Sequence, residues 1–271
     1  MASAGIVLCG GLSSRMGRAK AWLPWRGRPM LAHVVDVLGG VVDEVVVVSS
    51  TRLEPPPVDA PVLRDRQPEL GPLAGIREGL AHVKAELAYV TGTDAPFLDP
   101  AFVKTLLGQG GAAAPEMDGH VQTLAAVYPR SGLAAAESLL AAGRLRPLFL
   151  LEAVGYRKLG EGELPGTRSL RGFNTPAEYL AAVAEVDPAA TATLELLGRA
   201  RLAVGRRELE VPVGTLGEVL AHARPAAELC EGDRVARPYL VSLDGRQFVR
   251  DARIPIGAGE HVVVLDSSVG G

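Results

Sequence analysis

A glycine-rich, basic loop near the start of the chain has the residue types that bind phosphate groups. Gly10 and Gly11 are adjacent, so the backbone there can approach a ligand closely with its N–H groups unobstructed. Arg15 and Lys20 add cationic donors, which suit phosphate oxygens. The loop follows an apolar segment at residues 5–9. We therefore predict a polyphosphate-binding site at the end of a buried strand.

Two common phosphate-binding motifs do not fit this loop. A Walker loop requires G-x-x-x-x-G-K-[ST], but Gly17 is followed by Arg18 and Ala19. The dinucleotide motif G-x-G-x-x-G is excluded because Leu12 stands where its second glycine should be. The segment Leu8–Lys20 instead resembles the signature L-x-G-G-x-S-x-R-M-G-x-x-K of nucleotidyltransferases, which move a nucleoside monophosphate onto a phosphorylated acceptor.

Asp94, which follows the apolar segment 87–91, is the best candidate for binding a metal ion. Mg²⁺ is usually held by one or two carboxylates together with substrate phosphates and waters. Its charge would stabilise displacement at an α-phosphorus and the departing pyrophosphate. Asn174 is the candidate for a second oxygen ligand. The alternatives are a turn before Pro96 for Asp94 and a position before the last helix for Asn174.

The histidines give no sign of a catalytic base. None of the five has a spacing typical of a metal site or of a base beside a nucleophile; they are His33, His82, His120, His222 and His261. A phosphate acceptor would not need a base, because its second pKa is about 6 and it is largely ionised at neutral pH. Such an acceptor needs orientation and charge screening instead.

The first 187 residues alternate between strand-like and helix-like segments, which indicates a Rossmann-like α/β domain. We expect a mostly parallel sheet with helices on both faces. Ligands bind beyond the carboxyl ends of such strands, where the glycine loop, Asp65 and Asp94 all fall. Asp65 would accept hydrogen bonds from a base or ribose, or lie in a surface loop. Strands are expected at 5–9, 44–49, 61–63, 87–91 and 111–114, helices at 30–38, 73–82, 102–107 and 176–186, and an added strand or hairpin within 119–128.

The remainder of the chain predicts a second, smaller α+β domain. A proline-containing stretch of small residues marks a linker at 188–198, and residues 199–271 are expected to form a β-grasp domain. Thr215 and Glu218 form a capping-box pattern at the start of a helix at 216–222. Strands are expected at 200–204, 208–213, 239–243, 247–250 and 260–266.

Bulk properties exclude several classes of partner. The net charge of −3 gives no electrostatic footprint for nucleic acid or an anionic membrane. Every apolar run, the valine run Val45–Val48 included, is far too short to span a bilayer, and no signal peptide is expected. The two cysteines, Cys9 and Cys230, make neither a disulfide framework nor a zinc site. We expect a protein of the reducing cytoplasm.

Residues 1–185 resemble the molybdenum cofactor guanylyltransferase family. Besides the glycine loop, the segments Gly71–Ile76 (G-P-L-A-G-I) and Asn174–Tyr179 (N-T-P-x-E-Y) carry the resemblance. It implies Mg²⁺-dependent transfer of GMP from GTP to the terminal phosphate of molybdopterin, with release of pyrophosphate. By the same likeness, Leu8, Cys9 and Gly10 would line the nucleotide, Lys20 would hold phosphate, and Asp94 would bind both metal and phosphate. The predicted catalytic residues are Arg15, Lys20 and Asp94, the predicted nucleotide-binding residues are Leu8, Cys9, Gly10, Gly11, Lys20, Ser49, Asp65 and Asp94, and the predicted metal ligands are Asp94 and Asn174.

Two departures from that family leave the base specificity open. Cys9 stands where the family usually has Ala, and Ser49 stands where an Asn often helps to bind the nucleotide. The alternatives are a CTP-dependent or sugar-phosphate nucleotidyltransferase, or a carrier whose first domain binds nucleotide without catalysis.

The second domain resembles the small sulfur-carrier proteins of molybdopterin and thiamine synthesis. The resemblance is carried by Val241–Arg246, Gly259–Leu265 and the tail Ser267–Gly271. It implies that the carboxylate of Gly271 is adenylated and then converted to a thiocarboxylate. The partners that it implies for the tail are an adenylating enzyme and the large subunit of molybdopterin synthase.

Overall fold

The computed structural model describes residues 2–10, 15–225, 227–245 and 247–266. The chain divides into two compact units, each described separately below. Unit 1 comprises Met1–Leu12, Lys20–Trp22 and Pro29–Gly172, and unit 2 comprises Ser13–Ala19, Leu23–Arg28 and Phe173–Gly271. Parts of the N-terminal signature therefore group with the C-terminal residues, which differs from the expected division into 1–187 and 199–271.

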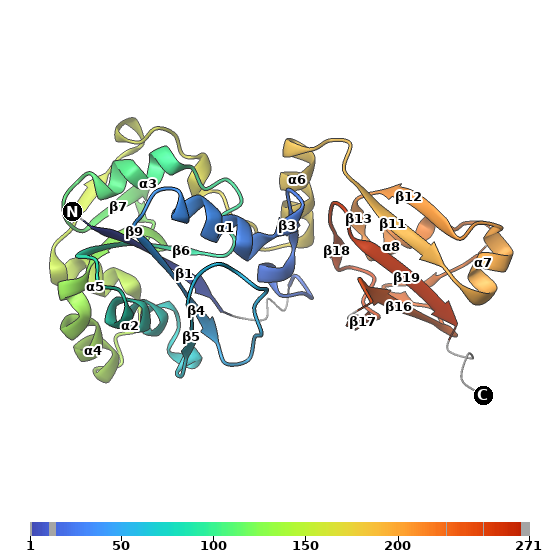
Figure 1. The fold of residues 1–271 in the computed structure, drawn as a ribbon, viewed down its shortest axis with the longest axis horizontal. Helices are drawn as coiled ribbons and strands as arrows, with labels where there is room; N and C mark the ends of the chain where they lie inside the picture. The colour runs from blue at the N-terminus through green and yellow to red at the C-terminus, as the bar shows by residue number, and fades with distance from the viewer. Residues whose placement is uncertain (1, 11–14, 226, 246, 267–271) are drawn as a thin grey trace. The chain divides into compact units, whose positions relative to one another are not determined.

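The centre of unit 1 is a mostly parallel sheet in which strand β1 lies between β4 and β6 (Figure 1). Strands β4, β1 and β6 are parallel, β5 continues the parallel set beside β4, and β9 runs antiparallel to β6. The order is β10-β7-β9-β6-β1-β4-β5, with β8 paired to β7. The strands are β1 (Ser3–Cys9), β4 (Glu44–Ser50), β5 (Val62–Asp65), β6 (Leu87–Gly92), β7 (Ala113–Met117), β8 (His120–Val121), β9 (Ala125–Pro129) and β10 (Arg157–Leu159).

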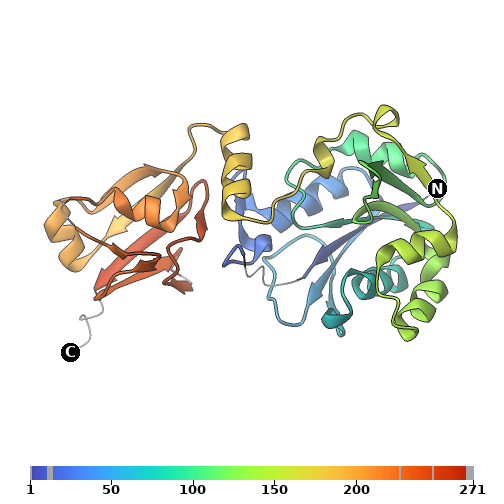
Figure 2. The same cartoon turned by 180° about the vertical axis from the view of Figure 1, so that it is seen from behind.

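Helices cover both faces of this sheet, as the sequence predicts for a parallel α/β domain. Helices α1 and α3 lie on one face, and α2, α4 and α5 lie on the other, which the view from behind also shows (Figure 2). The helices are α1 (Met30–Gly39), α2 (Pro72–His82), α3 (Pro100–Leu107), α4 (Leu133–Ala141) and α5 (Pro147–Val154), and the 3-10 turns are η1 (Lys20–Trp22), η2 (Pro68–Leu70), η3 (Arg130–Gly132), η4 (Glu161–Glu163) and η5 (Arg168–Leu170).

Glycines allow helix α2 to lie close against strand β1. A Cβ on Gly79 would lie 2.6 Å from Cγ2 of Ile6, and one on Gly75 would lie 3.0 Å from Cδ2 of Leu8. A side chain at Gly79 fits only if the buried side chain of Ile6 shifts. This close packing fixes the start of α2 beside the end of β1, and so helps to shape the edge at which the predicted site residues lie.

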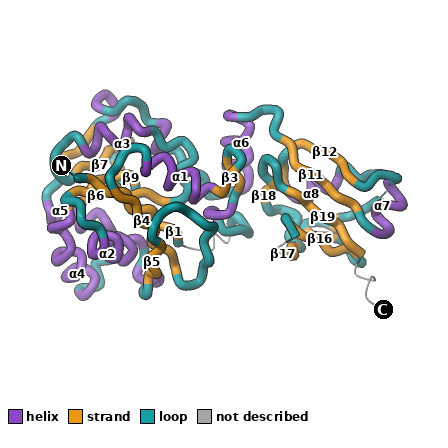
Figure 3. The backbone as a smooth tube through the Cα atoms, in the orientation of Figure 1, coloured by secondary structure: helices purple, strands orange, loops and turns teal. Residues whose placement is uncertain are grey.

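Unit 2 contains a five-stranded mixed sheet with order β12-β11-β19-β16-β17 (Figure 3). Two neighbouring strands of this sheet, β11 and β19, are parallel, and helix α8 packs on the sheet through Leu216, Val219 and Leu220. The strands are β11 (Thr191–Leu196), β12 (Glu208–Pro212), β16 (Tyr239–Leu243), β17 (Gln247–Val249) and β19 (His261–Asp266), and the helices are α6 (Pro176–Val186), α7 (Gly198–Val204) and α8 (Leu216–Ala221). Short pairs are β13 (Gly214–Thr215) with β18 (Pro255–Ile256), β14 (Cys230–Glu231) with β15 (Arg234–Val235), and β2 (Pro24–Trp25) with β3 (Arg28–Pro29).

Two segments of unit 2 differ from the sequence prediction. Residues 191–196, predicted as part of a linker at 188–198, form the inner strand β11. Residues 200–204, predicted as a strand, belong to helix α7 instead. The carboxylate of Asp266 accepts the backbone N–H of Arg199 at 2.6 Å, which stabilises the first turn of that helix.

Across the described ranges, no helix is both long and apolar enough to cross a membrane.

Candidate functional site

The candidate site lies where the strand order of unit 1 reverses. From β1 the chain continues to β4 and β5 on one side, and then places β6 on the other side of β1. At such a switch point the loops after the neighbouring strands separate, which leaves a crevice for ligands at the carboxyl ends. Gly10 follows β1 at this edge, and Asp94 follows β6. Both lie in loops predicted from the sequence to bind the ligand.

Lys20 and Asp94 are in direct contact. Lys20 begins the 3-10 turn η1, and its Nζ lies 2.6 Å from Oδ2 of Asp94. The side chain of Lys20 is 15% exposed and that of Asp94 is 36% exposed, so the pair is partly open to solvent. The structure therefore brings together the predicted phosphate-binding cation and the predicted metal ligand, which are 74 residues apart in the sequence.

Two glycines allow the backbone to approach Asp94 closely. A Cβ on Gly92 would lie 2.7 Å from Oδ1 of Asp94, and one on Gly172 would lie 2.7 Å from its backbone oxygen. The absence of side chains at these positions lets the carboxylate lie against the backbone at the end of β6. A fixed, partly exposed carboxylate fits a Mg²⁺ site whose other ligands are substrate phosphates and waters.

Two predicted nucleotide-binding residues, Cys9 and Ser49, point into the protein. They are paired in register on β1 and β4, and are 1% and 0% exposed. Burial raises the pKa of the Cys9 thiol to about 11, so it stays protonated at neutral pH. The Ser49 hydroxyl lies within hydrogen-bond distance of two backbone oxygens, those of Ser50 and Leu53. Any contact of these two positions with a nucleotide would therefore come from the backbone.

Asp65 ends strand β5 and is buried rather than in an exposed loop, at 7% exposure. Its Oδ1 accepts the backbone N–H of Gln67 at 2.9 Å. This contact stabilises the turn after β5 and shows a structural role beside the predicted role in binding base or ribose. Leu8 is half-buried and packs against Gly75.

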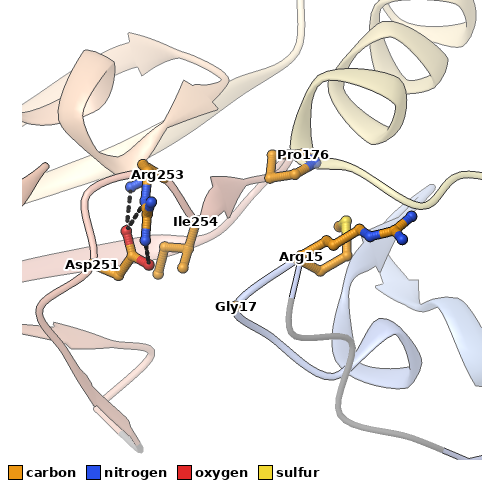
Figure 4. Close-up of a pocket in the computed structure, with 7 residues that line it drawn as sticks. Arg15, Gly17, Pro176, Asp251, Arg253 and Ile254 are labelled. Atoms are coloured by element: carbon orange, nitrogen blue, oxygen red, sulfur yellow. Dashed lines mark hydrogen bonds and ion pairs between the residues drawn. The ribbon is translucent and has the colours of Figure 1, made fainter.

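Asn174 and Arg15 belong to unit 2. The Asn174 backbone N–H donates to Oε2 of Glu178 at 2.6 Å, and Thr175 caps helix α6, so Asn174 does precede the last helix. Its role as a metal ligand stays a prediction. Arg15 is exposed and lines a cavity of about 270 Å³ in unit 2 (Figure 4). Figure 4 shows its guanidinium directed away from the paired Asp251 and Arg253 on the other side of that cavity.

Two predicted residues lie outside the described part of the chain, so their roles stay predictions. They are Gly11, predicted to bind nucleotide, and Gly271, predicted to carry sulfur.

One ion pair that involves a residue of the signature was not predicted from the sequence. Arg18, at a variable position of the signature, forms a bidentate ion pair with Glu260 in unit 2. Its Nη2 lies 2.6 Å from Oε1 of Glu260, and its Nη1 lies 2.9 Å from Oε2. A separation of 242 residues leaves no local signal for this contact.

Comparisons with known proteins find similarity over the first two thirds of the chain. Residues 5–155 match the family model described as the MobA-like NTP transferase domain. A protein of Bacillus cereus, named a probable molybdenum cofactor guanylyltransferase, is 37% identical over 134 residues, covering 46% of this chain and 67% of the relative. A protein of the same name from Mycobacterium tuberculosis is 35% identical over 187 residues, covering 65% of this chain and 93% of the relative.

Solved structures show the same fold for this region. Molybdopterin-guanine dinucleotide biosynthesis protein A from Archaeoglobus fulgidus superposes with a TM-score of 0.54 at 22% identity, covering 66% of this chain and 96% of the other. The 2-C-methyl-D-erythritol 4-phosphate cytidylyltransferase from Thermus thermophilus has a TM-score of 0.51 at 18% identity, covering 67% and 97%. At these identities the likeness concerns the fold alone.

Proposed function

Because the chain belongs to the MobA-like NTP transferase family, we propose that this nucleotidyltransferase moves GMP from GTP to the terminal phosphate of molybdopterin. The names of the relatives that match at 35% and 37% identity support the guanylyl group and the molybdenum cofactor as its substrates. The observation that carries the proposal is the contact of Lys20 with Asp94 at the switch point of the sheet.

The residues of the site suggest how the transfer proceeds. An oxygen of the acceptor's terminal phosphate attacks the α-phosphorus of GTP, the bond from that phosphorus to the bridging oxygen breaks, and pyrophosphate leaves. The acceptor phosphate is already ionised at neutral pH, so no side chain has to remove a proton. Lys20 would exchange part of its contact with Asp94 for the nucleotide phosphates, which keeps its ammonium paired throughout.

A divalent cation fits the proposed site at Asp94. Mg²⁺, when bound there, would neutralise charge on the reacting phosphates. Asp94 would hold it through the carboxylate that lies against Gly92, with Asn174 as the proposed second ligand. The residues of this chain then have two separate tasks: Asp94 fixes the cation, and Lys20 fixes the phosphates.

A nucleotide comparison tests this proposal. Pyrophosphate release is measured with GTP or CTP, Mg²⁺ and molybdopterin. We expect turnover with GTP and at least about tenfold less with CTP, the discrimination that about 1.4 kcal/mol of binding energy gives. Preference for CTP would overturn the guanylyl assignment, and turnover only with another phosphorylated acceptor would overturn the assignment of molybdopterin.

For unit 2 we propose a sulfur-carrier role for a domain of the β-grasp type. Taken in chain order, the strands of its main sheet lie in the order second, first, fifth, third, fourth, with the first and fifth parallel. This arrangement, with α8 following the second strand, supports the β-grasp prediction. Asp266 ends the last strand, and Gly271 follows it by five residues in the sequence.

Mass spectrometry of the intact chain tests the carrier role. The Gly271 carboxylate would react with ATP to give an acyl adenylate and pyrophosphate, and a sulfide donor would then displace AMP to leave a thiocarboxylate. After incubation with an adenylating enzyme, ATP and a sulfide source, the mass should change by replacement of one oxygen by sulfur. An unchanged mass with a partner that is active on another carrier would contradict the proposal.

A further inference from the structure

The Arg18–Glu260 ion pair is buried in unit 2. The side chains are 8% and 4% exposed, and both guanidinium nitrogens that face the carboxylate are within 2.9 Å of its oxygens. Nη1 of Arg18 also donates to the backbone oxygen of Pro255 at 2.8 Å, and the Gly257 N–H donates to Oε2 of Glu260 at 2.7 Å. Each charged group is therefore paired and has a further hydrogen-bond partner.

The neighbours of this ion pair leave little room for the loop to move. Met16 is fully buried, and a Cβ on Gly17 would lie 2.6 Å from Cγ2 of Ile254. The hydroxyl of Tyr179 donates to the backbone oxygen of Pro24 at 2.5 Å, and the same Tyr179 and Pro24 leave no space for a side chain at Gly257. Residues 16–18 are thus held by packing as well as by charge.

Removing either partner of a buried ion pair is costly. Removing one partner leaves an uncompensated charge in a site with little water, so the remaining side chain must rearrange. Arg18 is followed by Ala19 and Lys20, so only two peptide bonds separate it from the residue that contacts Asp94. Arg18 stands at a variable position of the signature, and Glu260 lies outside it.

We propose that Glu260 is a positioning residue for the nucleotide site, because through Arg18 it fixes the backbone that leads to Lys20. This inference rests on the proposed function for the statement that the loop binds nucleotide. It means that a residue of the proposed carrier region sets the nucleotide affinity of the transferase.

The test is the variant Glu260→Gln, which keeps the size of the side chain and removes its charge. Hydrogen–deuterium exchange of peptides spanning residues 15–20 is measured without nucleotide, and KM for GTP and kcat are measured separately. We expect exchange of this segment to become at least about fivefold faster and KM to rise about tenfold, with kcat within about twofold of the wild type.

A matched control is Glu195→Gln. Glu195 is a nearly buried carboxylate on β11, and it pairs with Arg207 at 2.8 Å and lies 2.9 Å from Nε2 of His261. Its loss should lower the melting temperature and leave both the exchange of residues 15–20 and the KM unchanged. Equal effects of the two variants on the exchange would show a general loss of stability and overturn the proposal.

A double variant keeps the test decisive if Glu260→Gln folds poorly. Arg18→Met combined with Glu260→Gln leaves no unpaired charge, so it should fold better than the single variant and show the same rise in KM. Unchanged exchange of residues 15–20 in either variant would overturn the inference and leave the proposed function standing. Faster exchange with an unchanged KM would overturn the binding of nucleotide by this loop, and the positioning role with it.

Discussion

Replacing Lys20 by Met should separate nucleotide binding from folding. The side chain of Lys20 is 15% exposed, and its ammonium lies 2.6 Å from a carboxylate that is 36% exposed. In the folded chain without ligand, a pair this close to solvent contributes at most about 1 kcal/mol. We therefore expect the melting temperature of Lys20→Met to fall by no more than about 4 °C.

The effect on nucleotide binding should be much larger. A hydrogen bond from an ammonium to phosphate contributes about 1.5–3 kcal/mol, which corresponds to a loss of about 10- to 150-fold in affinity. Isothermal titration of GTP with Mg²⁺ into the wild type and Lys20→Met measures this difference. The control is Lys104→Met, which removes an exposed ammonium from helix α3 and should leave the affinity unchanged. Equal affinities of the wild type and Lys20→Met would refute the assignment of Lys20 to phosphate.

Further substitutions test the metal site, the buried thiol and the packing of α2. Asp94→Asn should lower the rate of pyrophosphate release at least about 100-fold, measured by a coupled assay, whereas Asp99→Asn in the cap of α3 should keep activity; equal rates would contradict the role of Asp94. The pKa of the Cys9 thiol is about 11 in the folded chain and about 9 in the unfolded chain. The unfolded chain therefore loses this proton first, and the free energy of unfolding falls as the pH rises from about 9 to about 11. Between pH 8 and pH 10, urea unfolding should show the wild type losing about 1 kcal/mol more than Cys9→Ala, and parallel losses would argue against this. Gly79→Ala should lower the free energy of unfolding by about 1–3 kcal/mol, because its methyl group would lie 2.6 Å from Ile6, and an unchanged urea midpoint would show that the strand yields without cost.

The parts of the site that could be predicted from sequence are those set by local chemistry. The glycine loop and Asp94 each follow an apolar strand, Lys20 ends the signature, and parallel strands bring their carboxyl ends to one edge. The capping box of helix α8 is also predicted from sequence, and Thr215 accepts the backbone N–H of Glu218 at the start of that helix. Such features depend on a few neighbouring residues, so they can be predicted without knowledge of the tertiary structure.

The elements that were missed depend on distant contacts or on weak patterns. Helix α7 has a cap from Asp266, which is 67 residues away from Arg199, and its apolar run by itself is equally typical of a strand. Strand β11 carries the small Ala192 at a buried position, which weakens its alternation and gives the segment the composition of a linker. The Arg18–Glu260 contact joins residues 242 apart, so only the folded chain shows it.

Helices α4 and α5 were not predicted, although the sequence carries local signals for both. Residues 133–141 are rich in Ala and Leu, which favour helices, and Pro147 stands at a first helical position. These differences concern covering helices, and they leave the edge with Lys20 and Asp94 unaffected.

The chain is proposed to transfer GMP to a phosphorylated acceptor at the site of Lys20 and Asp94, and one labelling experiment tests this most directly. GTP labelled at the α-phosphate is followed through a reaction with molybdopterin and Mg²⁺, with separation of the products. We predict that the label appears in molybdopterin, in amounts equal to the pyrophosphate released, and that Asp94→Asn abolishes both. Label that stays in GTP, or that is released as free GMP without modification of molybdopterin, would contradict the proposed transfer.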